Sequence, residues 1–274
     1  MINQHYFDHD LAKLSYYVFG SGPEIMLCFH GYGMHGKQFQ ILEEKLGNKF
    51  TFYGFDLFFH KDTKLKNNSF ENIQKGLTKT EWANFIIDFC AHRNIDSFSV
   101  IGYSMGTHYA TSLVEMIPHR ITNYVLVAPS ALKPGKLVEF FSKNKIGNKF
   151  LEKLVLSEKA LIRLLKFCKG LNFIDDVGHQ IMLKEINTPD LRFSLYACFT
   201  YLRFLETDKI KLQKILMTNP IKSIFIFGQK DKMYPPTIGT KFCSLIAKSH
   251  TIVLDENHEM INQPFVNELA KLLI

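Results

Sequence analysis

The stretch Phe98-Ser99-Val100-Ile101-Gly102-Tyr103-Ser104-Met105-Gly106 decides the fold of this chain. Its first half is apolar, as in a buried strand, and its second half has the pattern Gly-x-Ser-x-Gly. Gly102 and Gly106 are the small neighbours that a serine needs at a sharp strand-to-helix turn. The following residues, 107–116, have helical character. We therefore predict that Ser104 sits at the head of a helix, where N–H groups favour a developing negative charge.

Strand-like and helix-like segments alternate on both sides of this stretch. Predicted strands cover residues 16–19, 25–29, 50–55, 124–128, 224–228 and 251–254, and predicted helices cover 38–46, 80–90, 236–247 and 264–273. Thr78 or Thr80 is the expected cap of the helix over 80–90. Such alternation predicts right-handed βαβ units and an α/β fold with a mostly parallel sheet that helices cover.

Residues 131–214 differ from the rest of the chain. They have helical periodicity, with a clear amphipathic stretch over 151–169, and no convincing strand. They also hold 16 Lys and Arg against 9 Asp and Glu, a net charge of +7, which is the whole excess of the 274-residue chain. We therefore predict one core domain formed by residues 1–130 and 215–274, with a helical insertion over 131–214.

Two further side chains stand where a serine nucleophile needs partners. A serine hydroxyl is a poor nucleophile unless a base takes its proton and a third group orients that base. Asp231 follows the predicted strand 224–228, and His258 follows the strand 251–254. Catalytic groups on parallel sheets gather at such strand ends. The alternatives are a turn aspartate that caps a helix and an ordinary loop histidine.

With these residues in place, the chain resembles the α/β-hydrolase family over nearly its full length. The resemblance implies an eight-stranded, mostly parallel sheet with helices on both faces and an inserted helical cap. It also implies a nucleophile elbow at Ser104, with His258 as general base and then acid and Asp231 as the orienting carboxylate. The segment Phe29-His30-Gly31-Tyr32-Gly33 resembles the family's oxyanion loop.

By the same resemblance, the oxyanion hole consists of the N–H groups of Met105 and Tyr32, with Gly33 as the alternative second donor. His30, Gly31, Gly102 and Gly106 are expected to support this geometry. The chain departs from the family in two loops, where Phe59 and Lys61 replace glycines beside Asp56 and His60, and where Asn257 precedes His258. These departures concern loop geometry and not the reacting groups.

The predicted function is hydrolysis of a small or medium carboxylic ester or thioester through an acyl-enzyme on Ser104. Two alternatives remain: a carbon–carbon bond hydrolase or lyase with the same triad, and a non-catalytic binding protein on a hydrolase scaffold. The mechanism needs no cofactor, and we expect no metal site. The cap is expected to be a lid, whose apolar side chains either line a pocket or pack the lid onto the core: Phe140, Phe141, Phe150, Leu154, Leu161, Leu164, Leu165 and Phe167.

The positive charge of the cap has three interpretations: a solvated helix surface, attraction of anionic substrates, or contact with an anionic membrane surface. Arg163, Arg192 and Arg203 are the candidates for binding a substrate carboxylate, because arginine offers paired hydrogen bonds. We expect no nucleic-acid partner, since no aromatic–basic motif is evident. The oligomeric state cannot be predicted.

The remaining features favour a cytoplasmic protein. The five cysteines are odd in number and widely spaced, which favours buried, reduced thiols. The first residues lack the basic start and apolar core of a signal peptide, so none is expected. No apolar run reaches the ~18 residues of a transmembrane helix, so integral membrane association is not expected.

Overall fold

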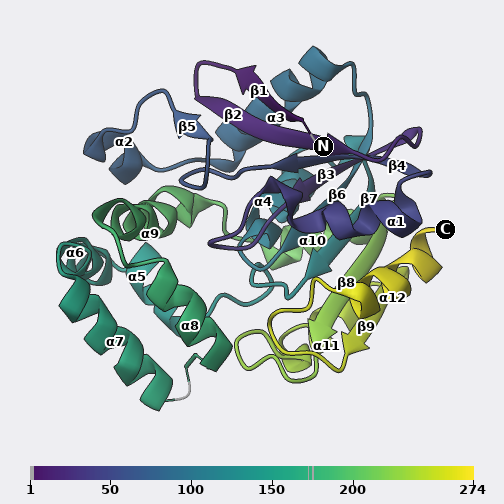
Figure 1. Ribbon diagram of the computed structural model, residues 1–274. Coiled ribbons are helices and arrows are strands. Elements are labelled where there is room, and N and C mark those ends of the chain that lie inside the picture. Colours follow the sequence, from purple (N-terminus) through teal and green to yellow (C-terminus); the bar gives the residue numbers. More distant parts are fainter. Residues whose placement is uncertain (1–2, 172, 175) are drawn as a thin grey trace.

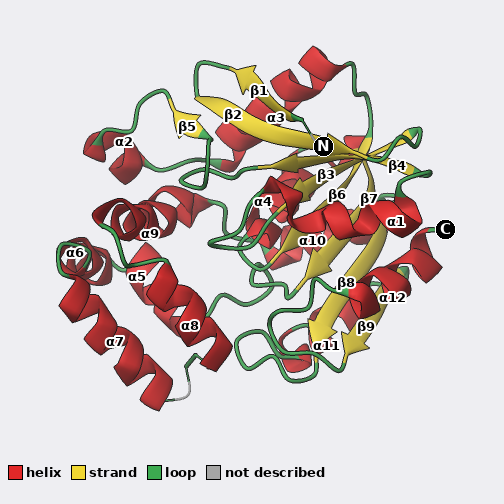
Figure 2. Ribbon diagram, in the orientation of Figure 1, coloured by secondary structure: helices red, strands yellow, loops and turns green. Residues whose placement is uncertain are grey.

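A nine-stranded sheet forms the centre of the molecule in the computed structural model, which describes residues 3–171, 173–174 and 176–274 (Figures 1 and 2). The strands are β1 (Gln4–Asp8), β2 (Ala12–Phe19), β3 (Glu24–Phe29), β4 (Phe50–Phe55), β5 (Lys64–Leu65), β6 (Phe98–Tyr103), β7 (Ile121–Val127), β8 (Lys222–Gly228) and β9 (Ser249–Leu254). They are arranged in the order β1-β2-β4-β3-β6-β7-β8-β9, and β5 pairs with β2.

The sheet is parallel from β4 to β9 and antiparallel at one edge. Strands β4, β3, β6, β7, β8 and β9 pair in parallel, whereas β2 pairs antiparallel with β1, β4 and β5. This arrangement confirms the predicted α/β fold class with a mostly parallel sheet. The short strands β1 and β5 were not predicted. Only Phe7 is buried in β1, so an apolar pattern was too weak to reveal it.

Helices cover both faces of the sheet and form a further layer beside it. They are α1 (Glu43–Leu46), α2 (Phe70–Lys75), α3 (Lys79–Arg93), α4 (Gly106–Met116), α5 (Lys136–Lys143), α6 (Lys145–Leu154), α7 (Glu158–Gly170), α8 (Asp176–Lys184), α9 (Pro189–Tyr201), α10 (Lys209–Thr218), α11 (Thr240–Ser244) and α12 (Gln263–Leu273). On one face, α1 and α12 pack together over a cluster of buried side chains. On the other face, α3 and α10 pack against α4.

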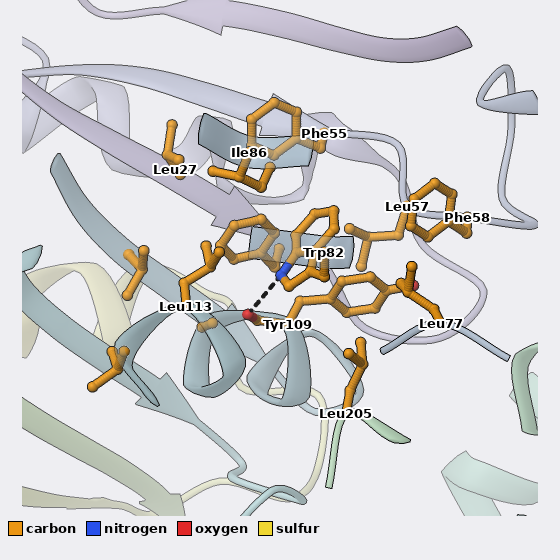
Figure 3. Close-up of a cluster of buried hydrophobic side chains, with 14 of the residues drawn as sticks. Leu27, Phe55, Leu57, Phe58, Leu77, Trp82, Ile86, Tyr109, Leu113 and Leu205 are labelled. Carbon is orange, nitrogen blue, oxygen red and sulfur yellow. Dashed lines mark hydrogen bonds between the residues drawn. The ribbon is translucent and has the colours of Figure 1, made fainter. Parts of the chain in front are cut away.

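The packing of α3 on α4 shows how the larger core is filled. Trp82 of α3 and Tyr109 of α4 are both buried, and their rings meet edge to face at 5.0 Å (Figure 3). The indole N–H of Trp82 donates to the Tyr109 carbonyl oxygen at 3.0 Å, so the one polar atom of that ring is satisfied. This contact anchors α4, the helix that follows Ser104.

Two predicted helices and the amphipathic stretch differ from a single regular helix in the structure. The amphipathic stretch 151–169 is two helices, because the chain turns after α6 and Ser157 caps the start of α7 by accepting from the Ala160 N–H. The helix predicted over 236–247 is a 3₁₀ turn, Pro236–Ile238, followed by the short α11. The helix predicted over 38–46 is mostly 3₁₀, Gly36–Leu42, and continues into α1.

Helices α5 to α9 lie between β7 and β8 in sequence and form a layer of their own beside the sheet (Figure 1). Among them, α6 packs on α5, α7 and α9. The segment predicted as an insertion, 131–214, includes these helices, and its end falls inside α10, which packs on α4. Among the described residues, no helix is long and apolar enough to cross a bilayer.

Candidate active site

Ser104 lies at the turn between β6 and α4, at the carboxyl end of a central strand. Its φ angle is 49°, in the left-handed region that side chains rarely adopt. A Cβ atom at Gly102 would lie 2.6 Å from the Gly106 carbonyl oxygen, and one at Gly106 would lie 1.9 Å from the Phe29 carbonyl oxygen. Glycine on both sides of Ser104 is therefore a steric requirement of this turn.

His258 lies between Ser104 and Asp231. Its Nδ1 is 2.8 Å from Oδ2 of Asp231, and its Nε2 is 3.1 Å from Oγ of Ser104. The other carboxylate oxygen, Oδ1, accepts from the N–H groups of Met233 and Tyr234 at 2.8 and 3.0 Å. The Asp231 side chain is fully buried, and that of His258 is 9% exposed. The structure thus brings the three predicted side chains into one hydrogen-bonded series.

His30 is buried in the loop that follows β3. Its Nδ1 lies 2.7 Å from the Gly31 carbonyl oxygen, and its Nε2 accepts from the Leu57 N–H at 3.0 Å. A ring that accepts at Nε2 carries its proton on Nδ1, so His30 is neutral. Burial holds the pKa of His30 well below its usual value. His30 therefore ties the loop after β3 to the loop after β4, as a supporting residue would.

His60 also links the loop after β4 to the loop after β3. Its Nδ1 lies 2.9 Å from the Phe58 carbonyl oxygen, and its Nε2 accepts from the Gly33 N–H at 3.0 Å. Burial lowers the pKa of His60 to about 4. Because His60 already occupies the Gly33 N–H, that group is a poor candidate for the second oxyanion donor.

The N–H groups of Tyr32 and Met105 stand in contrast to that of Gly33. Among the described residues, neither donates a hydrogen bond to a protein acceptor. The neighbouring Gly31 N–H is held by Oε1 of Gln38 at 3.0 Å. Tyr32 and Met105 therefore offer the two backbone donors that the sequence analysis named first.

The loop after β4 keeps the backbone that glycine would favour, although two glycines are replaced. Phe59 and Lys61 have φ angles of 66° and 48°. Asp56, at the start of this loop, accepts from the Gly36 N–H at 2.8 Å and is buried. Asn257, in contrast, is not among the residues with positive φ, and its side chain accepts from the Glu259 N–H. The departure before His258 therefore does not require left-handed backbone.

A pocket of about 420 Å³ extends from Ser104 and His258 into the layer of helices α5 to α9. Most of its lining is apolar, and four of the eight cap side chains named in the sequence analysis belong to it: Phe141, Leu161, Leu164 and Leu165. Phe140, Phe150 and Phe167 are exposed instead. Among the described residues, no group of three or more His, Cys, Asp or Glu side chains is placed to hold a metal ion.

The three arginines predicted to bind a substrate carboxylate lie elsewhere. Arg163 is exposed on α7. Arg192 is buried and donates to two backbone carbonyl groups, and Arg203 donates to three. None of them is among the described residues that line the pocket. Their positions do not support the predicted role. Helical spacing alone does not show which side of a helix meets a pocket, so the sequence could not place these side chains.

Two tyrosines beside His258 escaped the sequence analysis. The Tyr103 hydroxyl donates to the His258 carbonyl oxygen at 2.6 Å, and its ring lies 5.4 Å from the imidazole. The Tyr234 ring lies 5.6 Å from the imidazole. Tyr103 also explains Gly31, where a Cβ atom would lie 2.7 Å from the Tyr103 ring. Each tyrosine lies within three residues of a predicted triad member, and this proximity in the sequence could have indicated both of them.

Comparison with known proteins agrees with the fold of this chain. The family model described as alpha/beta hydrolase fold matches residues 24–153, which include the loop at Tyr32 and the turn at Ser104. The chain has the alpha/beta hydrolase fold. Structures of this fold match nearly the whole chain. A hydrolase from Pseudomonas aeruginosa, 17% identical, aligns with a TM-score of 0.70 over 98% of this chain and 97% of that one.

Two other solved structures illustrate the range of proteins with this alpha/beta hydrolase fold. An alpha/beta hydrolase enzyme from a Medee basin deep-sea metagenome library is 13% identical and has a TM-score of 0.70, over 98% of this chain and 95% of that one. The thioesterase domain from the curacin biosynthetic pathway is 13% identical and has a TM-score of 0.63, over 99% of both chains. At such low identities, the likeness establishes the fold alone.

Curated relatives match shorter segments. The dihydrolipoyllysine-residue acetyltransferase component of the acetoin cleaving system of Cupriavidus necator is 27% identical over 122 residues, which is 44% of this chain and 31% of that protein. A Mycoplasma genitalium protein whose name proposes an esterase or lipase is 25% identical over 150 residues, which is 51% of this chain and 53% of that protein. The matches span about half or less of the length of these relatives.

Proposed function

We propose that this protein is a serine hydrolase that cleaves a carboxylic ester or thioester through an acyl-enzyme on Ser104. The fold and the relative named for esterase or lipase activity support a hydrolase. The observation that carries the finer proposal is the hydrogen-bonded series from Asp231 through His258 to Ser104, at 2.8 and 3.1 Å. A base within reach of the hydroxyl, itself held by a carboxylate, is the arrangement that activates a serine.

In the proposed reaction, the Ser104 hydroxyl attacks the substrate carbonyl carbon while His258 Nε2 takes its proton. Asp231 holds the Nδ1–H side of the ring and stabilises the imidazolium that forms. The tetrahedral intermediate then collapses, the carbon–oxygen or carbon–sulfur bond breaks, and His258 returns the proton to the departing alcohol or thiol. Water, activated by the same imidazole, hydrolyses the acyl-enzyme and releases a carboxylic acid.

The negative charge that develops on the carbonyl oxygen needs donors that are already in place. The N–H groups of Tyr32 and Met105 are suited to this role, since neither is used by another described residue. Met105 also precedes α4, an 11-residue helix whose N-terminus favours negative charge. Losing one such donor costs ~10²–10³ in rate in comparable sites.

We further propose that residues 131–214 form a lid and that its pocket binds an apolar acyl chain. Phe141, Leu161 and Leu165 would surround the chain. The pocket volume of about 420 Å³ leaves room for a medium-length acyl chain with its carbonyl group at Ser104.

The test is hydrolysis of p-nitrophenyl esters from acetate to dodecanoate. We expect kcat/KM to rise with chain length to a maximum at medium chains, and Ser104→Ala to lower it by at least about 10³-fold. The matched control is Ser244→Ala, which changes an exposed serine of α11. Equal activity of the Ser104→Ala variant would contradict the proposal. Slow reaction with every ester would instead favour a carbon–carbon hydrolase or lyase.

A further inference from the structure

We propose that the outer surface of α6 and α7 docks this protein on an anionic lipid surface, from which its ester substrates are taken. The surface, called the α6–α7 face below, consists of Lys145, Ile146, Lys149, Phe150, Lys153, Leu156, Lys159, Arg163, Lys166 and Phe167. The inference rests on the proposed function for its ester substrate, whereas the docking can be measured without any hydrolysis.

Large apolar side chains protrude from this face. Ile146 is 78% exposed, Leu156 82%, Phe167 63% and Phe150 48%. Ile146 and Phe150 lie on α6, Phe167 lies on α7, and Leu156 lies in the turn between these two helices, which pack on each other. Exposed apolar side chains occur singly on most surfaces, but several on adjoining helices mark a surface that meets an apolar partner.

Cations alternate with these side chains along the sequence. Residues 145–170 contain 7 Lys and Arg against 2 Asp and Glu, a net charge of +5. Among the described residues, Lys145, Lys149, Lys153, Lys159 and Lys166 form no salt bridge. Apolar side chains among unpaired cations suit a helix that lies in a bilayer interface with anionic lipids. Each such lysine adds attraction near an anionic membrane surface.

The position of these helices connects the face to the site. Helices α6 and α7 form the outer edge of the helical layer, at the left of the molecule in Figure 1. The inner side of α7 supplies Leu161, Leu164 and Leu165 to the pocket that reaches Ser104. One helix therefore faces the acyl pocket on one side and presents cations and apolar side chains on the other. A lipid surface against α7 would hold acyl chains one helix diameter from the pocket.

The composition of the face favours a lipid surface over an acidic protein. Lysine is depleted at the centres of protein–protein interfaces, where arginine and aromatic residues prevail. The α6–α7 face has five lysines and one arginine, and its cations alternate with the apolar side chains along the sequence. This mixed pattern fits a bilayer interface. Lysine ammonium groups would reach the anionic phosphates of the lipids while the apolar side chains enter the boundary of the acyl chains.

The experiment is co-sedimentation of the full chain carrying Ser104→Ala, which prevents hydrolysis, with vesicles of phosphatidylcholine alone or with phosphatidylglycerol added. Two further variants are built on it. One carries Lys149→Gln, Lys153→Gln and Lys166→Gln, and the other carries Ile146→Ser, Leu156→Ser and Phe167→Ser. The matched control removes the same charge from exposed lysines of α1, α11 and the loop after α11: Lys45→Gln, Lys241→Gln and Lys248→Gln. Thermal unfolding of each variant shows that it is folded.

We expect binding to the phosphatidylglycerol vesicles only, falling with added salt. The lysine triple variant should bind more than about tenfold more weakly, the apolar triple variant should also lose binding, and the control should bind like its parent. No binding to anionic vesicles would overturn the inference, as would equal losses in the lysine triple and control variants, which would show a general charge effect. These outcomes are independent of ester hydrolysis, so failure of the docking and failure of the proposed function are distinguishable.

Discussion

Ser104 and Lys61 adopt nearly the same left-handed backbone, with φ angles of 49° and 48°, for different reasons. At Ser104, the strained turn holds the hydroxyl 3.1 Å from the base, so the strain serves the proposed chemistry. At Lys61, the side chain is exposed and takes no part in the site. Glycine would be expected at this second position, and the φ angle explains why.

Lys61→Gly should therefore stabilise the protein. A non-glycine residue in this region of φ costs about 1–2 kcal/mol of strain, which glycine relieves. Roughly half of that gain is offset, because glycine has greater freedom in the unfolded chain. We expect a gain of about 0.5–1 kcal/mol in the free energy of unfolding, measured with urea. Lys61→Ala is the matched control and should gain nothing, because alanine keeps the Cβ atom. A gain in both variants would show that the lysine side chain, and not its backbone, is responsible.

Asp231→Asn should lower kcat by about 10³–10⁴-fold with little change in stability. An asparagine carbonyl can still accept from the N–H groups of Met233 and Tyr234, whereas its amide group would face Nδ1 of His258 and favour the wrong tautomer. Asp255→Asn is the control, because that carboxylate is exposed and pairs only with Lys230 among the described residues. If kcat of the Asp231→Asn variant stayed near that of the native chain, Asp231 could not be the orienting group.

Among the secondary-structure elements, α3 shows how local sequence decides a boundary. Both Thr78 and Thr80 were candidates for its cap. The structure selects Thr78, whose hydroxyl accepts from the Glu81 N–H at 3.2 Å, while the Glu81 carboxylate accepts from the Thr78 N–H at 2.9 Å. This reciprocal capping box satisfies two N–H groups that the helix leaves without partners.

Thr78→Ala should therefore lower the free energy of unfolding by about 1 kcal/mol. Thr80→Ala, in the same helix and also exposed, should change it by less than about 0.5 kcal/mol. Urea unfolding of both variants against the native chain measures the difference. Equal losses would mean that the capping box does not contribute to stability.

The predictable elements were those whose burial leaves a clear pattern. Strands β3, β6, β7 and β8 are buried along most of their length, so their continuous apolar runs predicted them. The break between α6 and α7 was missed because buried residues recur at a spacing of four on each side of it, at Leu151 and Val155 and again at Leu161 and Leu165. The step of six residues between Val155 and Leu161 and the cap at Ser157 are the signals that mark the turn.

The site likewise contains residues that the local sequence predicts and contacts that it does not. Ser104, Asp231 and His258 were predictable because each follows a strand that ends at the same edge of the sheet. The contact of Tyr103 with the His258 carbonyl group joins residues 155 positions apart in the chain, and no local pattern encodes such a contact. The position of Arg192 depends likewise on helices packing together, which buries it against the Val155 carbonyl group.

Over the molecule as a whole, the net positive charge and the buried histidines that could bind protons lie in different parts of the chain. The net positive charge belongs to the helical segment 131–214, whereas the buried histidines His30 and His60 fasten loops at the strand ends of the core. Protonation of these rings would remove the hydrogen bonds that they accept. Stability of the whole fold should therefore depend on pH through them.

The free energy of unfolding should fall as pH is lowered. His60 has a pKa of about 4 in the folded protein, against ~6.5 in an unfolded chain. Between these values the unfolded state binds more protons, so stability rises with pH and is lost as pH falls from about 6.5 to 4. This difference amounts to about 3 kcal/mol for His60.

His60→Gln tests this contribution, because a glutamine carbonyl can still accept from the Gly33 N–H. Urea unfolding at pH 7 and at pH 4.5 should show a smaller loss of stability in this variant than in the native chain. His119→Gln, at an exposed histidine, serves as the matched control and should follow the native chain. Parallel pH profiles for the His60→Gln variant and the native chain would contradict the assignment of a buried, neutral His60.

The most direct measurement is labelling with a fluorophosphonate probe, located by peptide mass spectrometry. An activated serine attacks the phosphorus atom and displaces fluoride, so we expect a single adduct on Ser104 in the native chain. Ser104→Ala should abolish the adduct, and His258→Ala should slow it strongly, because the hydrogen bond from Ser104 to the base is lost. Labelling at another serine, or labelling that His258→Ala leaves unchanged, would contradict the triad.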